Sequence, residues 1–357
     1  MTKVNEQKIT TNPFYHYQDL WKSENFKKWE AEQSDEFKKY RRLWQECPRL
    51  RKAPPAPISI NLELTDVCNA GNKPCIMCPK WFLKPHNQFM AYEDAVRVLD
   101  EARSLGVYAV NLNGAGESLL HKDFPKIVQY ARKIGFLDVM VHTNGTMLTR
   151  EMSEKLIDAG LTRLIVSVDS HIPEIYQTIR PNFKFSTVYQ NVKNFIAVRD
   201  QKGKREPILR LTMVVMKHNV DTIKDTIKFW SFADYITIND CMYFDDFKVF
   251  DFDKQKINSE AKQKGLIYAC APLYQQLTVT IDFKIISCST IYAKNYKILG
   301  HYGKQSLKEA WEGRELAEMR KAHESGRCTD IPCCEKCDLP QIELLKKIRE
   351  QDGVMLR

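Results

Sequence analysis

Three cysteines stand close together in the segment that begins at Cys68 and ends with Cys75-Ile-Met-Cys78. The segment follows a strand-like run at residues 58–64. Three thiolates on one loop leave a tetrahedral metal ion one protein ligand short, but they suit a cubic iron–sulfur cluster whose fourth iron stays open to another ligand. The sequence therefore predicts a reactive iron–sulfur site at the end of a strand.

A second group of cysteines lies toward the C-terminus. Its four members are Cys270, Cys288, Cys334 and Cys337, and Cys333 is an alternative to Cys334. Four thiolates complete either a closed iron–sulfur cluster or a structural zinc site, and the spacing alone leaves both open.

The size and composition point to an intracellular protein. In a chain of 357 residues, eleven cysteines indicate metal ligation or catalysis more than disulfides. No apolar run approaches the roughly 20 residues of a membrane span, and the polar N-terminus lacks the apolar core of a signal peptide. The net charge of +9 is spread over runs flanked by acids, which favours a solvated surface over a nucleic-acid partner. We expect a cytoplasmic protein without membrane or nucleic-acid partners.

Strands and helices alternate from residue 58 onward, which implies parallel strands joined by right-handed crossovers. Six such units make about three quarters of a TIM barrel, in which functional groups gather at the C-terminal ends of the strands. The predicted fold is α/β, a partial (β/α)6 TIM barrel with a small cysteine-rich C-terminal α+β subdomain. Strands are expected at 58–64, 107–112, 137–142, 163–168, 208–216 and 234–239, and helices near 91–105, 123–134, 150–159, 172–200 and 219–231.

The chain divides into four predicted regions. Residues 1–57 form a helical arm that ends in the Pro-rich linker Ala53-Pro-Pro-Ala-Pro57, and residues 58–261 form the barrel. Residues 262–340 form the cysteine-rich subdomain, with a hairpin of 277–281 and 284–288 that bears Cys288. Residues 341–357 are a helical tail.

The order of these motifs resembles the radical S-adenosylmethionine (SAM) superfamily over residues 58–340. After the cysteine loop, the segment Asn113-Gly-Ala-Gly-Glu117 follows the second barrel strand. The resemblance implies that Gly114, Gly116 and Glu117 hold the methionine amine of SAM. The family usually has three residues between its first two cysteines, whereas this chain has six, from Asn69 to Pro74.

Further SAM-binding residues follow from the same resemblance. The fourth barrel strand ends in Ser167-Val168-Asp169, and Arg180 follows it. The resemblance implies that Ser167 and Asp169 at this strand end, together with Arg180, bind the SAM carboxylate. An arginine fork suits a carboxylate because it donates two parallel hydrogen bonds. Asn144 is a candidate for the ribose, or a plain turn residue. Met77, Val215 and Met216 are candidates for the adenine, or core packing.

The second cysteine group resembles the twitch subdomain, the short form of the SPASM extension. The form in aminocyclitol dehydrogenases of the radical SAM group is the most similar. There, four cysteines hold an auxiliary [4Fe–4S] cluster without an open iron. Phe283 occupies the hairpin position that is usually a glycine.

The resemblance implies an oxidoreductase or epimerase that uses two [4Fe–4S] clusters and SAM, with a flavodoxin or ferredoxin as electron donor. Its 5′-deoxyadenosyl radical would abstract hydrogen from a carbinol carbon of a sugar-like or aminocyclitol-like molecule. Cys241, at the end of the sixth strand, could return a hydrogen atom in an epimerisation, or could be an inert core residue. Modification of a ribosomal peptide is the main alternative. A zinc-containing nucleic-acid-binding protein is a remote one.

Overall fold

One ten-stranded sheet organises the chain in the computed structural model, which describes residues 18–84, 86–241, 245–249, 253–268, 270–288, 296–335 and 337–352. The strands follow the order β1-β7-β6-β5-β4-β3-β2-β8-β9-β10, so the sheet ends in two open edges and does not close. Their bounds are β1 Gln18–Lys22, β2 Ser59–Leu62, β3 Ala109–Asn111, β4 Asp138–Thr143, β5 Arg163–Ser167, β6 Ile208–Val215, β7 Tyr235–Asp240, β8 Gln276–Val279, β9 Lys284–Ile286 and β10 Ile298–His301.

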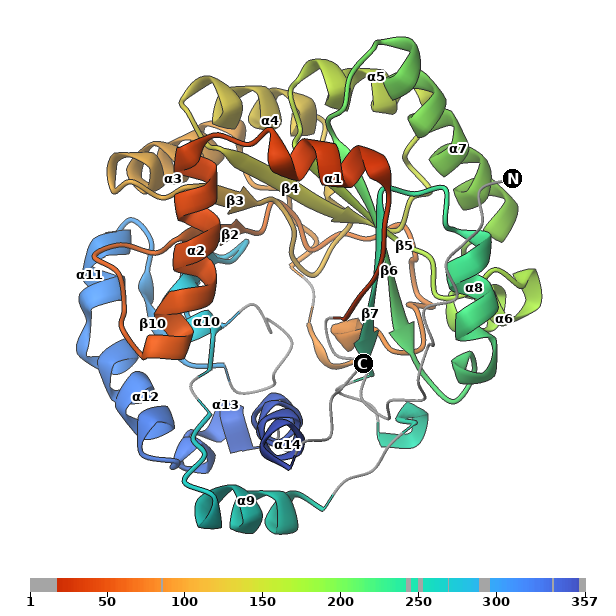
Figure 1. Ribbon diagram of the computed structural model, residues 1–357. Coiled ribbons are helices and arrows are strands. Elements are labelled where there is room, and N and C mark those ends of the chain that lie inside the picture. Colours follow the sequence, from red (N-terminus) through yellow and green to blue (C-terminus); the bar gives the residue numbers. More distant parts are fainter. Residues whose placement is uncertain are drawn as a thin grey trace.

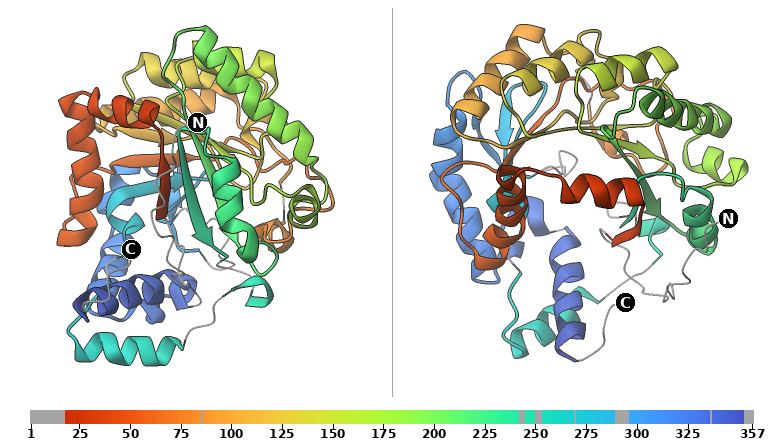
Figure 2. Two further views of the ribbon diagram at one scale, coloured as in Figure 1. Left: turned by 45° about the vertical axis from the view of Figure 1, so that its right-hand side comes forward. Right: turned by 45° about the horizontal axis from the view of Figure 1, so that its top comes forward.

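Strands β2 to β7 pair in parallel, each with the next along the chain. The helices between them lie along the outer side of the curved sheet (Figures 1 and 2). Those helices are α3 Tyr92–Ser104, α4 Phe124–Lys133, α5 Arg150–Asp158, α6 Pro173–Ile179, α7 Phe185–Gln201 and α8 Ile223–Phe229. The predicted α/β class with a partial barrel is confirmed, and all six predicted strands are present.

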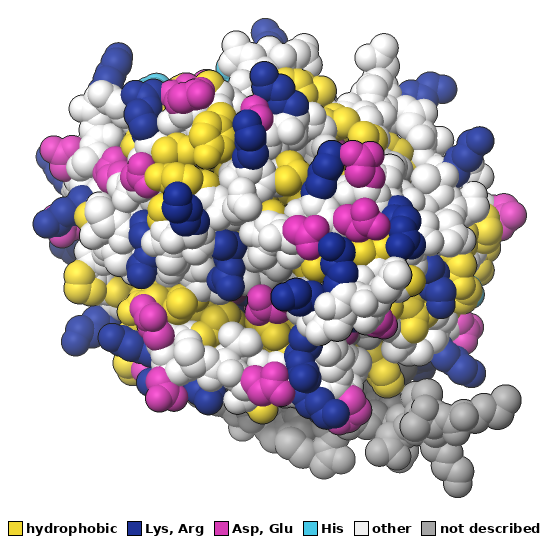
Figure 3. All heavy atoms as spheres, turned by 90° about the horizontal axis from the view of Figure 1, so that it is seen from above, with side chains coloured by type: hydrophobic (Ala, Val, Ile, Leu, Met, Phe, Trp, Pro, Cys, Tyr) yellow, Lys and Arg dark blue, Asp and Glu magenta, His cyan; other side chains and the backbone are white. Residues whose placement is uncertain are grey.

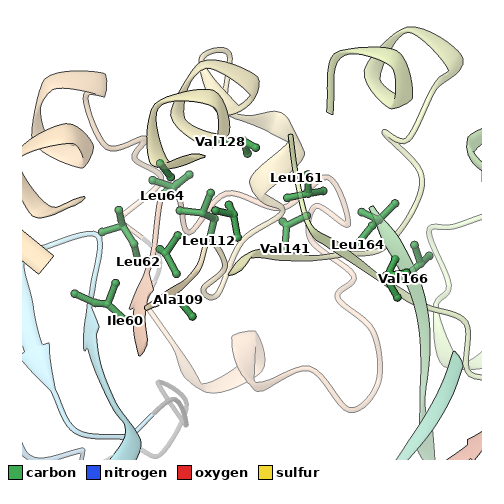
Figure 4. Close-up of a cluster of buried hydrophobic side chains, with 14 of the residues drawn as sticks. Ile60, Leu62, Leu64, Ala109, Leu112, Val128, Val141, Leu161, Leu164 and Val166 are labelled. Atoms are coloured by element: carbon green, nitrogen blue, oxygen red, sulfur yellow. The ribbon is translucent and has the colours of Figure 1, made fainter. Parts of the chain in front are cut away.

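The barrel strands alternate between an apolar outer face and a more polar inner face. Outward side chains such as Ile60, Val141 and Val166 are fully buried against the helices, and Figure 4 shows part of this cluster with Val128 of α4. Successive residues of a strand point to opposite faces. The positions between the buried apolar residues are therefore turned inward, and they include Asn61, Asn111, His142, Arg210, Thr237 and Asn239.

The N-terminal segment contributes a strand that the sequence analysis missed. Strand β1 pairs antiparallel with β7, where helices had been expected from about residue 14. Helices α1 Glu24–Ala31 and α2 Asp35–Leu50 follow, and the Ser23 and Ser34 side chains cap their N-termini. Short strands with few apolar residues carry little periodicity, so the pairing was not visible without the edge of β7.

Helix α2 is fixed to the barrel through a buried polar cluster. The Tyr40 hydroxyl donates to Asp138 at a distance of 3.1 Å, and the Arg163 guanidinium forms an ion pair with the same carboxylate. Asp138 is fully buried, and Thr162 also donates to it at 2.8 Å. These contacts set the position of α2 at the start of strands β4 and β5.

The C-terminal region continues the barrel sheet. Strand β8 pairs in parallel with β2, and β9 and β10 extend the sheet in antiparallel fashion. Phe283, in the turn between β8 and β9, has a φ of 60°, the left-handed conformation that glycine adopts most readily. Helices of this region are α9 Lys254–Gln263, α10 Pro272–Gln275, α11 Leu307–Glu312, α12 Arg314–Glu324, α13 Pro332–Glu335 and α14 Leu339–Gln351.

The surface charge is not segregated by sign on the face that Figure 3 shows. Lys and Arg side chains on that face are interspersed with Asp and Glu. None of the helices in the described part of the chain combines the length and the apolar composition that a membrane span requires.

Candidate active site

The first cysteine group lies on the loop that follows β2, at the C-terminal edge of the barrel strands. Cys68, Cys75 and Cys78 are each partly buried, and their thiols interact electrostatically with one another. The Cys78 amide donates to the Cys75 carbonyl at 2.9 Å, which closes a tight turn between the two ligand positions. Burial raises the pKa of the Cys78 thiol to about 11. A metal centre would therefore displace protons as it binds.

The long segment between Cys68 and Cys75 is held by neighbouring turns. The Asn69 side chain donates to the Thr146 hydroxyl at 2.7 Å and accepts from the side-chain amide of Asn144 at 2.8 Å. The Asn182 amide donates to the carbonyls of Ala70 and Lys73. The six-residue gap is therefore an anchored loop, and its three thiols lie within electrostatic range of one another.

A buried arginine reaches the cysteine loop from the end of α6. The Arg180 Nε donates to Asp169 at 2.6 Å, and its Nη1 lies 3.5 Å from the Cys75 sulfur. Burial is the largest influence and lowers the pKa of Arg180, but Asp169, Cys75 and Tyr176 together raise that pKa above its usual range. The guanidinium is thus a fixed positive charge beside the predicted cluster ligand.

The glycine motif after β3 packs too tightly for side chains. A Cβ on Gly114 would come within 2.2 Å of the Glu63 side chain, and one on Gly116 within 2.4 Å of the Val67 carbonyl oxygen. The Gly116 amide also donates to the Thr65 carbonyl. Both glycines are therefore required by the approach of the motif to the start of the cysteine loop.

Next to these glycines, the Asn113 Oδ1 atom is buried and lacks a hydrogen-bond partner among the described residues. A buried acceptor in this state favours a ligand that brings a donor, such as an amino group.

The Glu117 carboxylate forms its hydrogen bonds with neighbouring groups of the chain. Its carboxylate accepts from the Thr143 hydroxyl at 2.7 Å, from the backbone amide of Asn144 at 2.8 Å and from the backbone amide of Leu119 at 3.3 Å. Burial raises the pKa of this carboxyl, and those donors oppose the shift. Glu117 and Asn144 thereby join the turns after β3 and β4, and Asn144 also holds Asn69.

An apolar cluster lies behind the cysteine loop. It includes Met216 and Cys241, which are buried together with Ile179, and Met77 packs against them. Val215 belongs to the main core. Ser167, by contrast, ends β5 and faces its register partner Thr212 of β6 on the inner side. The structure therefore brings Met77, Met216 and Cys241 to one place beside the loop.

The second cysteine group converges between the end of β9 and helix α13. Cys270 interacts electrostatically with Cys288 and Cys337, and Cys334 interacts with Cys270 and Cys288. Cys333 neighbours Lys297 instead, although its sulfur lies 3.9 Å from that of Cys334. No three Cys, His, Asp or Glu side chains of the described residues close around a single ion.

One large cavity occupies the inside of the barrel. It has a volume of about 1170 Å³ and is lined by inward residues of β2 to β8. At its upper end lie Asn111, His142 and Asn239, each only two residues before Asn113, Asn144 and Cys241 respectively. Cys288 of the second cysteine group also lines this cavity. None of Cys68, Cys75 and Cys78 is among its lining residues.

Sequence reasoning missed several residues that shape the site. Glu63 is buried at the end of β2 and accepts from the amides of Ala115 at 2.7 Å and Ile281 at 3.0 Å. Asp66 accepts from the amides of His86, Asn87 and Gln88. An acid within an apolar strand was the available signal for Glu63, because a buried carboxylate needs donors. Cys328 also interacts electrostatically with Cys270.

Comparison with known proteins identifies both halves of the chain. Residues 62–229 match the family description "Radical SAM superfamily", and residues 270–338 match "Iron-sulfur cluster-binding domain", the SPASM family. A probable GTP 3′,8-cyclase of Methanothermobacter marburgensis is 37% identical over 122 residues, which are 34% of this chain and 38% of that protein. The matches to such curated relatives span about half of their length or less.

Solved structures share the fold. SuiB of Streptococcus suis bound to its precursor peptide SuiA has a TM-score of 0.59 at 15% identity, over 85% of this chain and 74% of that one. The structure of anSMEcpe with bound AdoMet and the Cp18Cys peptide has a TM-score of 0.59 at 15% identity, over 83% and 97%. At such identity the likeness concerns the fold.

The donor sets fit the cofactors of this family. Three thiols on one loop leave one iron of a cubic cluster open, and the orphaned Asn113 acceptor beside them suits an amine. The second match is to an iron–sulfur domain, so the zinc interpretation of the distal cysteines is not supported. The cofactors are SAM, the barrel [4Fe–4S] cluster and further iron–sulfur in the C-terminal domain. The chain carries a radical SAM domain at residues 62–229 and a SPASM-type domain at residues 270–338.

Proposed function

We propose that this radical SAM enzyme removes hydrogen from a carbinol carbon of a sugar-like or aminocyclitol-like small molecule, and that the principal outcome is dehydrogenation. Bound SAM and the reduced cluster would supply a 5′-deoxyadenosyl radical that takes the hydrogen atom from the carbinol carbon, and the substrate radical would become the ketone by losing its hydroxyl proton to water and one electron. The auxiliary cluster supplies a one-electron acceptor. The observation that carries the proposal is that the polar inward side chains of the barrel and Cys288 line the same cavity.

In this proposal Cys68, Cys75 and Cys78 hold the barrel cluster. The donor for the SAM carboxylate is Arg180, whose Nη2 has no hydrogen-bond partner among the described residues. Ser167 assists it, and Asp169 fixes the guanidinium by its 2.6 Å bond to Nε.

The glycine motif and the apolar cluster complete the proposed SAM site. Gly114 and Gly116 shape the backbone so that Asn113 Oδ1 accepts from the amine, and Glu117 and Asn144 hold that backbone in place. Met77 and Met216 offer an apolar surface to the adenine, with Val215 in the core beneath.

In the C-terminal domain, Cys270, Cys288, Cys334 and Cys337 hold the auxiliary cluster. Cys334 is favoured over Cys333 because it interacts with Cys270 and Cys288, while Cys333 neighbours Lys297. The same proposal places the enzyme in the cytoplasm, with a flavodoxin or ferredoxin as electron donor.

The lumen side chains suit a hydroxylated substrate. Asn111 and Asn239 each present a buried carbonyl oxygen without a hydrogen-bond partner among the described residues. Substrate hydroxyl or amine groups are the donors that such acceptors require. Burial, and secondarily the charge of Arg210, lowers the pKa of His142 to about 3, so its imidazole is neutral at physiological pH. It can therefore accept or donate a hydrogen bond without adding charge.

Epimerisation is the second outcome to be tested, because Cys241 is buried beside the cysteine loop. A thiol there would return a hydrogen atom to the substrate carbon. Dehydrogenation is preferred because Cys288 lines the lumen cavity, while Cys241 is not among its lining residues.

Peptide modification remains the alternative. SuiB and anSMEcpe, which share the fold, have peptides bound in their structures. The cyclases named among the curated relatives match only part of this chain, so they support the radical chemistry and not their own substrate.

The test is anaerobic turnover with SAM, dithionite and a panel of cyclitols and sugars deuterated at their carbinol carbons. We expect deuterium in 5′-deoxyadenosine and one ketone formed per 5′-deoxyadenosine. A Cys75→Ala variant should form neither product. A Cys270→Ala variant should still cleave SAM but form much less ketone. Turnover of peptides alone would overturn the proposal.

The epimerase outcome has its own experiment in deuterated water. If it is correct, the product carries solvent deuterium at the reacting carbon, and Cys241→Ala abolishes that incorporation. Ketone formation that is unchanged in Cys241→Ala supports dehydrogenation.

A further inference from the structure

The lumen cavity contains a cation without an acidic partner. Arg210 projects inward from β6, and its Nε donates to the Thr237 hydroxyl at 2.8 Å. Its guanidinium carbon lies 5.7 Å from the centre of the Tyr235 ring. Among the described residues, no Asp or Glu lies within ion-pair distance of it, although the other lumen arginine, Arg163, is paired with Asp138. Arg210 is partly buried, and a charge that is shielded from water is costly unless a counter-charge compensates it.

The neighbours of Arg210 do not neutralise it. Its register partners are Ile165 on β5 and Tyr235 on β7. The nearby His142 is kept neutral, as its lowered pKa shows. The two terminal nitrogens of the guanidinium thus remain available, in the planar geometry that binds an oxyanion through two parallel hydrogen bonds.

The outer part of the same cavity is also basic. Four residues of helix α2 line it, namely Lys38, Arg41, Arg42 and Arg49, and their spacing of three, one and seven residues places them along one side of the helix. Over the whole cavity, nine Lys and Arg residues contribute to the lining against two acids, Glu30 and Glu343. A cleft lined by one sign of charge attracts ligands of the opposite sign.

From these observations we propose that the substrate carries an oxyanion, a phosphate ester or a carboxylate, and that Arg210 binds it inside the lumen while the basic side of α2 attracts it. The inference rests on the proposed function and extends it to an anionic polyhydroxylated substrate. Four residues separate Arg210 from Val214, whose amide bonds to Asp169 near the cysteine loop. The anion would therefore lie about 13 Å along the strand from the level of Val214. This distance leaves room for a sugar-sized ring between the anion and the cysteine loop.

The experiment measures anion binding to the holoenzyme without turnover. Inorganic phosphate is titrated against the cluster-loaded protein by calorimetry, at ionic strength held constant with chloride. Acetate forms a second arm that distinguishes a carboxylate from a phosphate. The variants are Arg210→Gln, Arg210→Lys and the α2 double change Lys38→Gln with Arg42→Gln. Arg150→Gln, on the exposed α5, is the matched control.

We expect saturable binding of one of the two anions, weakened by about 30-fold or more in Arg210→Gln. Arg210→Lys should lie between, because it keeps the charge but loses the fork. The α2 double variant should mainly slow association, and Arg150→Gln should bind as the unchanged protein does. Iron content and circular dichroism verify that each variant is folded. If Arg210→Gln does not fold, Arg210→Lys decides the question.

Either of two results overturns the inference: neither anion binds, or binding is unaffected by the Arg210 substitutions. This outcome is separable from the proposed function. Ketone formation from a neutral sugar would support the proposed function and reject the inference that the substrate is an anion. Phosphate binding that depends on Arg210, without any carbinol chemistry, would support the anion site and reject the proposed function.

Discussion

Individual residues at the cysteine loop serve the fold as much as the cofactor. Gly116 touches the backbone of Thr65 and Val67, and Glu117 is held by three donors from the neighbouring turns. The family motif is thus also the joint between the ends of β2, β3 and β4. A substitution there should change stability and cluster retention together.

Gly116→Ala tests this joint. A Cβ would lie 2.5 Å from the Thr65 oxygen and 2.4 Å from the Val67 oxygen, and backbone atoms cannot move aside cheaply. We expect a loss of about 2–3 kcal/mol in the free energy of unfolding, with loss of bound iron. Gly71→Ala is the control, since its Cβ would meet nothing within 4 Å and only its φ of 59° opposes the change, which costs about 1 kcal/mol. Equal effects in thermal unfolding and iron assays would contradict the close-packing argument.

His323 gives the protein a sensitivity to acid. The side chain is buried in α12 beside Tyr268, and neither ring nitrogen has a partner among the described residues. Burial lowers its pKa to about 4, so the unfolded chain takes up a proton at a higher pH than the folded one. Stability is therefore full above the ordinary histidine pKa and is lost as the pH falls toward 4.

The contribution amounts to about 1 kcal/mol between pH 7.5 and pH 5.5. His323→Leu should remove that part of the decrease in unfolding temperature over this interval. Replacement of the exposed His301 serves as the control. An identical acid sensitivity in His323→Leu would show that the imidazole is not the group responsible.

At the scale of elements, helix α2 connects the N-terminal arm to the barrel and lines the cavity. Its attachment depends on Asp138, which receives hydrogen bonds from Tyr40, Thr162 and Arg163. The buried face of the helix fixes its position, and the opposite basic side then faces the cavity. The attachment and the proposed anion recognition are thus two sides of one helix.

Two substitutions separate a hydrogen bond from a buried charge. Tyr40→Phe removes one donor to Asp138 and should cost about 1 kcal/mol of unfolding free energy. Arg163→Met leaves the fully buried Asp138 carboxylate without its counter-charge and should cost about 3–5 kcal/mol. Denaturant unfolding of the two variants measures the difference. If Arg163→Met is no more destabilising than Tyr40→Phe, the ion pair does not secure this junction.

For the whole molecule, the two cysteine groups occupy different parts of one continuous sheet. The first follows β2, and Cys288 of the second follows β9, with β8 between these strands in the sheet. We expect each group to bind its cluster independently, because their ligands come from separate loops.

Iron analysis of anaerobically reconstituted protein tests that independence. The unchanged chain should bind about eight irons, and Cys78→Ala or Cys334→Ala about four each. Cys333→Ala is the matched control for Cys334→Ala and should retain about eight. The reverse result for these two adjacent cysteines would assign Cys333 as the ligand. Loss of all iron in Cys78→Ala would show that the sites depend on each other.

The prediction of the barrel from the sequence succeeded because its strands are long apolar segments separated by helices with clear periodicity, as in 163–168 and 208–216. The antiparallel β8–β9 hairpin was also predicted, but the pairings of β1 and of β8 with β2 were not. Strand β1 is five residues long and is defined by the edge of β7, and β8 joins β2 from more than 200 residues away. Such contacts depend on which strand edges remain open after the barrel forms.

The sequence by itself determined which chemical groups this protein has: three thiols on one loop, four more near the C-terminus and the glycine motif between them. These are local spacings, and they persist in any fold that brings strand ends together. Only the tertiary structure decided what surrounds these groups. It engaged Glu117 in the joint between strands and placed Arg210 inside the lumen beside a neutral His142. Among the described residues, it left the Asn113 acceptor without a hydrogen-bond partner and Arg210 without an acidic one. Burial and partnership arise from strands that are distant in sequence, so they exist only once the sheet has formed.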